Sequence, residues 1–256
     1  IAYAQGRGAK KDAAQALGWL RKAAAQGHVR AQQKLDALET RTPDQLFALY
    51  QQESDQAKHM EYLKMSARQG YAPAQYQLGE CYYYGRGVEE DEVQAAQWYR
   101  KSAQQGYAWA QYSLGYCYYY GQGVEKDRTQ AAYWFRKAAE QGNVPAQCNL
   151  GICYEDGIGV EKDTTQAAQW YRKAAQQGNA WAQNNLGICY ENGTGVEKNA
   201  AQAVQWYRKA AEQGNAWAQN NLGICYEYGR GRGKGFCPGR PVVPQSRPAR
   251  ARRCAE

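Results

Sequence analysis

The sequence has little of what membrane spans, metal sites and catalytic sites require. All of its apolar runs fall short of the roughly 18 residues that cross a bilayer as a helix, so no membrane span is predicted. Its only histidines, His28 and His59, lie far apart, and it has no Cys-x-x-Cys pair, which argues against a metal or cofactor site. None of the five serines is followed by lysine three residues later, so the Ser-x-x-Lys motif of the β-lactamase nucleophile is absent. These absences predict a protein that is not an enzyme.

What the sequence does contain is a repeat with a period of 36 residues. Glycine, cysteine and tryptophan keep this step, at Gly79, Gly115, Gly151, Gly187 and Gly223, at Cys81, Cys117, Cys153, Cys189 and Cys225, and at Trp98, Trp134, Trp170 and Trp206. A fixed period in this range marks an array of supersecondary units, each of which buries its apolar face by stacking on its neighbours. We therefore predict an all-α solenoid of 36-residue helix-turn-helix repeats.

Each copy divides into two predicted helices. In the copy from 108 to 142, the first helix is expected over about 109–119 and to stop at Gly121. Asp127, with Gln130 three residues later, is expected to cap the second helix. The residues expected to be buried are Ala110, Leu114 and Cys117 in the first helix and Ala131, Phe135 and Ala138 in the second.

Gly115 lies in the middle of its predicted helix, where glycine costs about 1 kcal/mol relative to alanine. Its recurrence in the other copies indicates that a large ring packs against it. Trp134 and Phe135 are the candidates for that ring.

Three motifs follow one another in the copies: Ala-x-Ala-Gln-x-x-Leu-Gly-x-x-Tyr, Gly-x-Gly-Val-x-x-Asp, and Ala-x-x-Trp-Tyr-x-Lys-Ala-Ala-x-Gln-Gly. They resemble the Sel-one-like repeat (SLR) family, a relative of the tetratricopeptide repeats, over about residues 6–231. The resemblance implies a right-handed α-solenoid that acts as a non-enzymatic adaptor or scaffold. It also implies that the first helices line a concave groove where a protein segment or extended peptide binds.

The copies are unequal. Residues 1–27 match a truncated first repeat that begins inside a first helix, and they carry no signal-peptide pattern. Residues 28–70 form a degenerate copy without the Gly-x-Gly turn, in which Thr42-Pro43 predicts a helix from Pro43 through Gln52. Residues 71–231 hold regular repeats, the last one incomplete. Residues 232–256 are a basic tail rich in Arg, Pro and Gly.

We interpret this tail as a frameshifted repeat. A further repeat would continue with a stretch such as Val-Glu-Lys-Asp-Phe-Ala-Gln-Ala-Val-Gln-Trp-Tyr-Arg-Lys-Ala. Available codons for that stretch, read from one base earlier, give the residues from Arg232 to Ser246. The alternative is a genuine basic, disordered tail, and resequencing the gene distinguishes the two.

The charge is unevenly distributed along the chain. The net charge is +8, but residues 230–256 hold 8 of the 32 basic groups and 1 of the 24 acidic groups. A basic balance favours nucleic-acid partners, and RNA binding by a helical-repeat array is the alternative function. The near-neutral charge of the remaining chain argues against it.

The five periodic cysteines are expected to be buried free thiols. Packed helices lie ~8–10 Å apart, beyond the ~7 Å limit between the Cα atoms of a disulfide. Some secreted members of the resembling family carry a second cysteine per repeat, which is absent here, and this favours a reducing compartment. Cys148 falls on the opposite side of its helix and is expected to be the most exposed thiol.

The partner-binding surface is expected on the side of each first helix turned away from the buried side, with an aromatic half and an amide-rich half. The candidate contacts are Trp109, Tyr112, Tyr116, Tyr120, Trp181, Asn184, Asn185, Trp217, Asn220 and Asn221. Trp and Tyr are common binding anchors, and Asn offers a donor and an acceptor to an extended backbone. The alternatives are inter-repeat packing for the tyrosines and inter-repeat hydrogen bonds for Asn185 and Asn221.

The last first helix is expected over Gln219 to Tyr228. The second helix that would cover Leu222, Cys225 and Tyr226 is replaced by the tail. We expect this uncapped edge to fray or to self-associate, because terminal repeats normally present a polar outer face.

Overall fold

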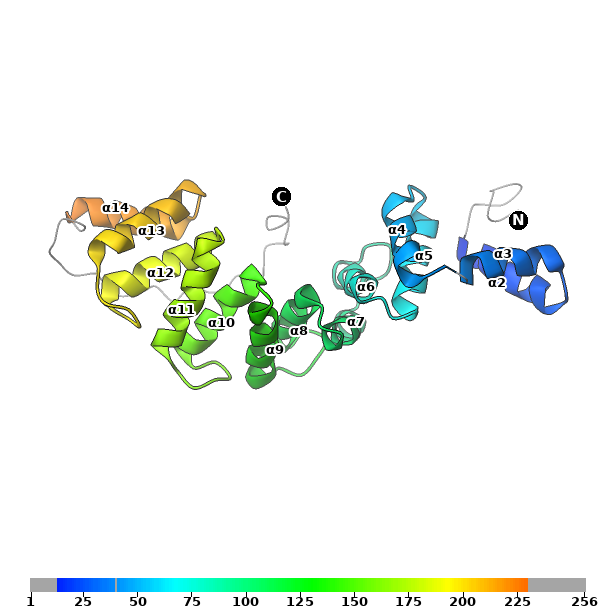
Figure 1. Ribbon diagram of the computed structural model, residues 1–256, viewed down its shortest axis with the longest axis horizontal. Helices are drawn as coiled ribbons and strands as arrows, with labels where there is room; N and C mark the ends of the chain where they lie inside the picture. The colour runs from blue at the N-terminus through cyan, green and yellow to red at the C-terminus, as the bar shows by residue number, and fades with distance from the viewer. Residues whose placement is uncertain (1–12, 40, 230–256) are drawn as a thin grey trace.

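The computed structural model describes residues 13–39 and 41–229, which form 13 α-helices and no strand. The helices follow one another along a single curved row, from α2 and α3 at one end to α13 and α14 at the other (Figure 1). The prediction of an all-α solenoid is confirmed. The expectations for residues 1–12 and for the tail lie outside the described residues.

The helices are α2 (Ala13–Ala25), α3 (Val29–Glu39), α4 (Pro43–Gln52), α5 (Gln56–Arg68), α6 (Ala72–Tyr84), α7 (Glu92–Gln104), α8 (Ala108–Tyr120), α9 (Arg128–Glu140), α10 (Val144–Asp156), α11 (Thr164–Gln176), α12 (Ala180–Asn192), α13 (Ala200–Glu212) and α14 (Ala216–Glu227). We call α6, α8, α10, α12 and α14 the first helices, and α7, α9, α11 and α13 the second helices. Helices α6, α8, α10 and α12 each pack against the second helix that follows, and each second helix packs against the next first helix.

Glycine and aspartate fix the turn between the two helices of a repeat, as the sequence predicts. Gly121 ends α8 in the left-handed conformation, at φ 80°, and its N–H donates to the carbonyl of Cys117 at 2.8 Å. Asp127 begins α9, and its Oδ1 accepts from the N–H groups of Thr129 and Gln130 at 2.9 and 3.0 Å. Each repeat therefore has its own start and stop signals.

The glycine in the middle of each first helix admits an aromatic ring from the second helix. A Cβ built on Gly115 would lie 2.8 Å from the ring of Phe135, closer than atoms pack. The ring predicted to cover Gly115 is therefore Phe135, while Trp134 packs, half-buried, on the cluster formed by α7 and α8. The same contact joins Gly79 to Tyr99, Gly151 to Tyr171, and Gly187 to Tyr207. Close packing of helix and ring explains why glycine recurs at this place.

The second glycine of three Gly-x-Gly turns closely approaches the backbone of the preceding repeat. Gly123 has φ 65°, and a Cβ there would collide with the carbonyl of Glu92 at the start of α7. Gly159 and Gly195 make the same approach to Arg128 and Thr164. Only glycine satisfies both the conformation and the space, so these turns set each repeat on the one before it.

Buried glutamines connect the helices. Gln111, 5% exposed, donates through Nε2 to the carbonyl of Ala103 in the preceding repeat at 3.2 Å, and its Oε1 accepts from Gln141 at 2.7 Å. Gln75, Gln147 and Gln183 make the same pair of bonds in their repeats. Because a buried amide is costly when unpaired, these bonds favour one register of the stack.

The degenerate copy contains three helices, α3, α4 and α5. Helix α4 pairs with α5, whereas α3 packs on α2, and α2 also contacts α5. The prediction of a helix from Pro43 through Gln52 is confirmed.

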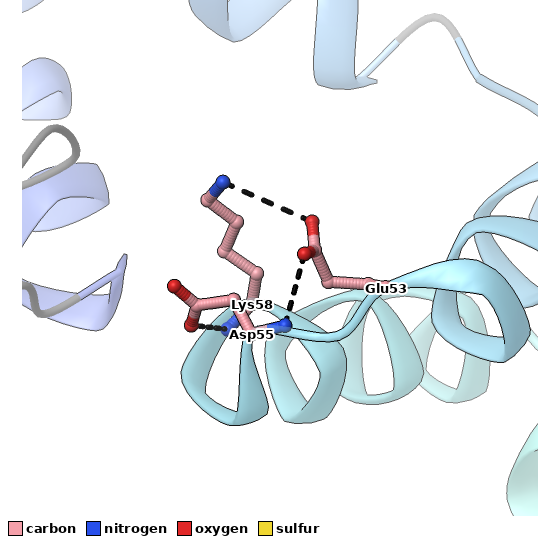
Figure 2. Close-up of polar contacts among 3 residues, drawn as sticks. All are labelled: Glu53, Asp55 and Lys58. Atoms are coloured by element: carbon pink, nitrogen blue, oxygen red, sulfur yellow. Dashed lines mark hydrogen bonds and ion pairs between the residues drawn. The ribbon is translucent and has the colours of Figure 1, made fainter.

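Carboxylates replace the missing glycines in the connection between α4 and α5. Glu53 Oε1 accepts the N–H of Asp55 at 3.0 Å, and Asp55 Oδ1 accepts the N–H of Lys58 at 3.3 Å (Figure 2). Lys58 Nζ lies 3.8 Å from Glu53 Oε2. The turn is therefore held by side chains and needs no left-handed residue.

Candidate interaction surface

Trp109, Trp181 and Trp217 lie at one recurring place, the first turn of the first helices. Trp109 in α8 is 40% exposed and Trp181 in α12 is 53% exposed, while Trp217 in α14 is half-buried. Pro73 and Pro145 fill this place in the other repeats, so the fold does not require a ring there. Exposed tryptophan is a strong anchor for a protein partner.

Tyrosines of α8 continue the aromatic surface along the helix. We call Tyr112, Tyr116, Tyr119 and Tyr120 the tyrosine cluster; all four are half-buried. The ring centroids of Trp109 and Tyr112 lie 6.4 Å apart at a steep angle, and those of Tyr116 and Tyr120 lie 4.4 Å apart. Tyr112 also packs on Phe135, at 6.0 Å. The rings thus hold one another in place before any partner arrives.

Three hydroxyl groups of the cluster, those of Tyr116, Tyr119 and Tyr120, stay protonated at neutral pH. Burial raises the pKa of Tyr116, and the neighbouring Tyr120 raises it further. Burial also raises the pKa of Tyr119 and of Tyr120. These phenols therefore remain neutral hydrogen-bonding groups that can both donate and accept.

Helices α8, α9 and α10 border a narrow crevice in this surface. It is lined by Tyr116, Tyr119, Tyr120, Phe135, Asn149 and Ile152. Its free volume is about 10 Å³, the space of one water, whereas small-molecule pockets typically hold about 300–1,000 Å³. The surface is therefore better suited to a macromolecular partner than to an enclosed small ligand.

The amide-rich half is divided between the surface and the stack, which corrects part of the predicted set. Asn184 is 4% exposed, and its Oδ1 accepts from Asn221 Nδ2 in the next first helix at 3.0 Å. This side of α12 faces the neighbouring repeat, so Asn184 is not free to contact a ligand. Asn185 is half-buried and Asn220 is exposed. Of the four asparagines, Asn220 is the most accessible.

Cys148 corrects a second expectation, because it is 6% exposed rather than the most exposed thiol. It lies in α10 at the place of Asn184 in α12, and it packs against the cluster that contains Tyr171 and Leu186. That cluster is formed by residues of α11 and α12, so the side of α10 opposite Leu150 is also covered. Burial raises the pKa of Cys148 to about 12.

The five periodic cysteines are buried free thiols, as predicted. Burial raises the pKa of Cys81 to about 11 and that of Cys117 and Cys153 to about 12. Such thiols are neutral at physiological pH and therefore poor nucleophiles and poor metal ligands. Within the described residues, no group of three or more His, Cys, Asp or Glu side chains is placed to hold a metal ion.

Sequence reasoning missed the use of the basic residues on the second helices. Arg136 Nη2 donates to the hydroxyl of Tyr154, 18 residues later, at 2.9 Å, and the same bond recurs in three other repeats. Lys101 lies over the ring of Trp98 at 4.1 Å. The signal was present, since Arg and Tyr both keep the 36-residue step. These cations contribute to packing within and between repeats.

Comparison with known proteins agrees with this geometry. The sequence model of the Sel1 repeat matches residues 1–28, 72–107, 110–143, 144–179, 182–215 and 218–235. Among residues 13–39 and 41–229, no helix is long and apolar enough to cross a membrane. None of the curated protein sequences matches this chain.

Two solved structures share both sequence and fold with the chain. A protective antigen present in uropathogenic Escherichia coli strains, which displays an SLR fold, is 40% identical with a TM-score of 0.67; the match covers 84% of this chain and 44% of the antigen. A Sel1 repeat protein from Oxalobacter formigenes is 38% identical with a TM-score of 0.67, and the match covers 74% of this chain and 78% of that protein. This chain thus spans less than half the length of the antigen. The chain belongs to the Sel1 repeat family, whose α-solenoids serve as scaffolds for protein–protein interactions and are generally without catalytic activity.

Proposed function

We propose that this solenoid binds an extended protein segment along its first helices, and that Trp109 and Trp181 are the principal anchors. The observation that carries the proposal is their exposure, 40% and 53%, at a place where other repeats have proline. Because neither the core nor the turns require tryptophan at this place, contact with a partner is the better explanation for it. Tryptophan is the residue most enriched where binding energy concentrates.

The tyrosine cluster supports the same segment from α8. Its rings contact one another and lie half-buried, so little side-chain entropy is lost when a partner covers them. Asn220 and Asn185 supply amide donors and acceptors toward the other end of the array. Asn184 and Asn221 are assigned to the stack, because they bond to each other between α12 and α14.

The proposed ligand is a peptide segment rather than RNA. The net basic charge that favours RNA resides mostly in residues 230–256. The arginines of the second helices are bonded to tyrosine hydroxyls, and several lysines lie over tryptophan rings. A surface of half-buried phenols and exposed indoles matches the aromatic anchors of protein interfaces.

A peptide-display selection on the full chain tests the proposal. Linear peptides selected on the chain are expected to lose at least about 10-fold in affinity on Trp109→Ala or Trp181→Ala, since anchor residues carry about 2 kcal/mol or more. The matched control is Tyr133→Ala, which removes a 48% exposed ring from the second helix α9. Circular dichroism confirms that each variant is folded. Peptides that bind both tryptophan variants normally, or that depend on Tyr133, would overturn the proposal.

A further inference from the structure

The first helices, which carry the exposed tryptophans, differ in charge from the second helices. The five first helices contain five acidic residues and neither a basic residue nor a histidine; the acidic residues are Glu80, Glu155, Asp156, Glu191 and Glu227. The four second helices contain nine basic and three acidic residues. The array is therefore acidic along one row of helices and basic along the other.

The cations of the second helices are held by the repeats themselves. Lys101, Lys173 and Lys209 lie over the rings of the tryptophans three residues before them, at 3.9 to 4.5 Å from the ring centroids. The arginines beside these lysines donate to tyrosine hydroxyls of the next first helix. The tryptophans of α7, α11 and α13 thus receive a cation from their own helix.

The tryptophans of the first helices receive no cation from the chain. The residues three and four places after Trp109 and Trp181 are all neutral: Tyr112, Ser113, Asn184 and Asn185. Among residues 13–39 and 41–229, no lysine or arginine lies over either ring. The face of an exposed indole attracts a cation, so a cation on these rings has to belong to a partner.

The repeat of α6 shows how the first-helix surface holds a cation. The guanidinium of Arg86, in the turn after α6, lies over the ring of Tyr84 at 4.7 Å from its centroid. Burial raises the pKa of the neighbouring Glu80, and the positive charge of Arg86 opposes that shift. In the next three repeats the place of Arg86 is neutral, because it is occupied by Gln122, Ile158 and Thr194. The same surface on α8, α10 and α12 therefore lacks this internal cation.

The surroundings do not neutralise the surface of α8, α10 and α12. The turns that follow these three helices hold five carboxylates and three lysines. At Tyr119 in the tyrosine cluster, burial raises the pKa, Arg128 of α9 lowers it and Asp156 of α10 raises it. The aromatic surface therefore lies in a region of net negative charge.

We propose that the segment bound along the first helices is basic, and that its lysine and arginine side chains contact the rings of Trp109, Trp181 and the tyrosine cluster beside the carboxylates of α10 and α12. This proposal rests on the proposed function and specifies the chemistry of its ligand. Charge complementarity carries it, since an acidic and aromatic surface favours a cationic partner and disfavours an anionic one. The second helices of another copy are also basic, but their arginines and lysines are held by tyrosine hydroxyls and tryptophan rings.

The first test uses the linear peptides selected on the full chain. Peptides that lose affinity on Trp109→Ala or Trp181→Ala are expected to carry a net positive charge. Replacing their lysines and arginines with glutamine should weaken binding at least about 10-fold, because both the charge attraction and the contact with the rings are lost. Tryptophan-dependent peptides that are neutral or acidic would overturn this inference and leave the proposed function standing. Peptides that depend on neither tryptophan would overturn the proposed function, and this inference with it.

Matched variants then test where the cations of the selected peptides lie. Thr194→Arg adds a positive charge at the place of Arg86 and should weaken binding several-fold, whereas Gln169→Arg adds the same charge on the exposed side of α11 and should not. Asp156→Asn should also weaken binding several-fold, whereas Glu140→Gln, which removes an exposed carboxylate from α9, should not.

Circular dichroism confirms that each of these variants is folded. Equal effects within both pairs would mean that the net charge of the chain, and not the first-helix surface, controls binding, and would overturn the proposal. If the chain without peptide sediments as a dimer that Thr194→Arg dissociates, a second copy is the occupant and the proposal is wrong.

Discussion

Replacing a mid-helix glycine with alanine should have opposite effects at two equivalent places of the array. In an open helix this change stabilises by up to about 1 kcal/mol, because alanine is the better helix former. At Gly151, however, the new Cβ would lie 2.5 and 2.6 Å from two ring atoms of Tyr171, where ordinary contacts between carbon atoms are about 3.5–4.0 Å. The ring would have to move by about 1 Å.

The ring of Tyr171 has no room for that movement. It is fully buried, and its hydroxyl is bonded to Glu155. Overpacking of this kind costs about 1–3 kcal/mol, and breaking the charge-assisted hydrogen bond adds about 1.5–3 kcal/mol. The two losses do not add in full, because a ring that moves away from the new Cβ relieves the overpacking but breaks the hydrogen bond. After the gain in helix propensity is subtracted, Gly151→Ala is expected to lower the free energy of unfolding by about 1–3 kcal/mol.

The assay is urea unfolding followed by circular dichroism, with the midpoint and slope of each variant compared. Gly223→Ala is the matched control, because it has the same place in its helix and no described neighbour within 4 Å. It is expected to leave the midpoint unchanged or to raise it. If Gly151→Ala and Gly223→Ala shift the midpoint in the same direction and by the same amount, ring packing is not the reason for the recurring glycine.

Three further perturbations test the turns, the buried pairs and the thiols. Tyr171→Phe keeps the ring but removes the bond to Glu155, so the free energy of unfolding should fall by about 1.5–3 kcal/mol in the same urea assay; no change would mean that the pair is not formed. Gly159→Ala should destabilise more than Gly157→Ala in thermal unfolding, because both have positive φ but only Gly159 meets the backbone carbonyl of Arg128; equal losses would exclude that contact. Burial raises the pKa of Cys81, Cys117 and Cys153 from 9.0 to about 11 or 12, so these thiols lose their protons in the unfolded chain at a lower pH than in the folded one. The free energy of unfolding should therefore be at its maximum below about pH 9 and fall as the pH rises toward 12. An equal urea midpoint at pH 8 and pH 10.5 would contradict the burial of these thiols.

The fold could be predicted from the sequence because its signals are local and repeated. Gly121 as a stop and Asp127 as a cap act within a few residues of themselves, and the structure confirms both. The contact of Gly115 with the second helix was also predictable, since a costly glycine in a helix needs a packing reason. The choice of Phe135 over Trp134 was not, because it depends on the rotation of α9 against α8.

The candidate surface could be predicted only in part, for the same geometric reason. Helical periodicity separates the side that faces the second helix from the opposite side, but it says nothing about the neighbouring first helix. Cys148 and Asn184 lie on the side that this neighbour covers, so both are buried although both were expected at the surface. Trp109 and Trp181 lie farther round the helix and remain exposed. Whether they bind a partner stays a prediction.

The contact of Gly123, Gly159 and Gly195 with the backbone of the preceding repeat has a consequence for how such a chain can diversify. These contacts involve only glycine and backbone atoms, so substitutions of surface side chains leave them unchanged. The rise and rotation from one repeat to the next therefore do not depend on the exposed side chains of the first helices. Exposed residues of the first helices can then be substituted one at a time without changing the curvature of the solenoid. If Trp109 and Trp181 anchor a peptide as proposed, the distance between them is set by the scaffold, and the peptide must be long enough to span it.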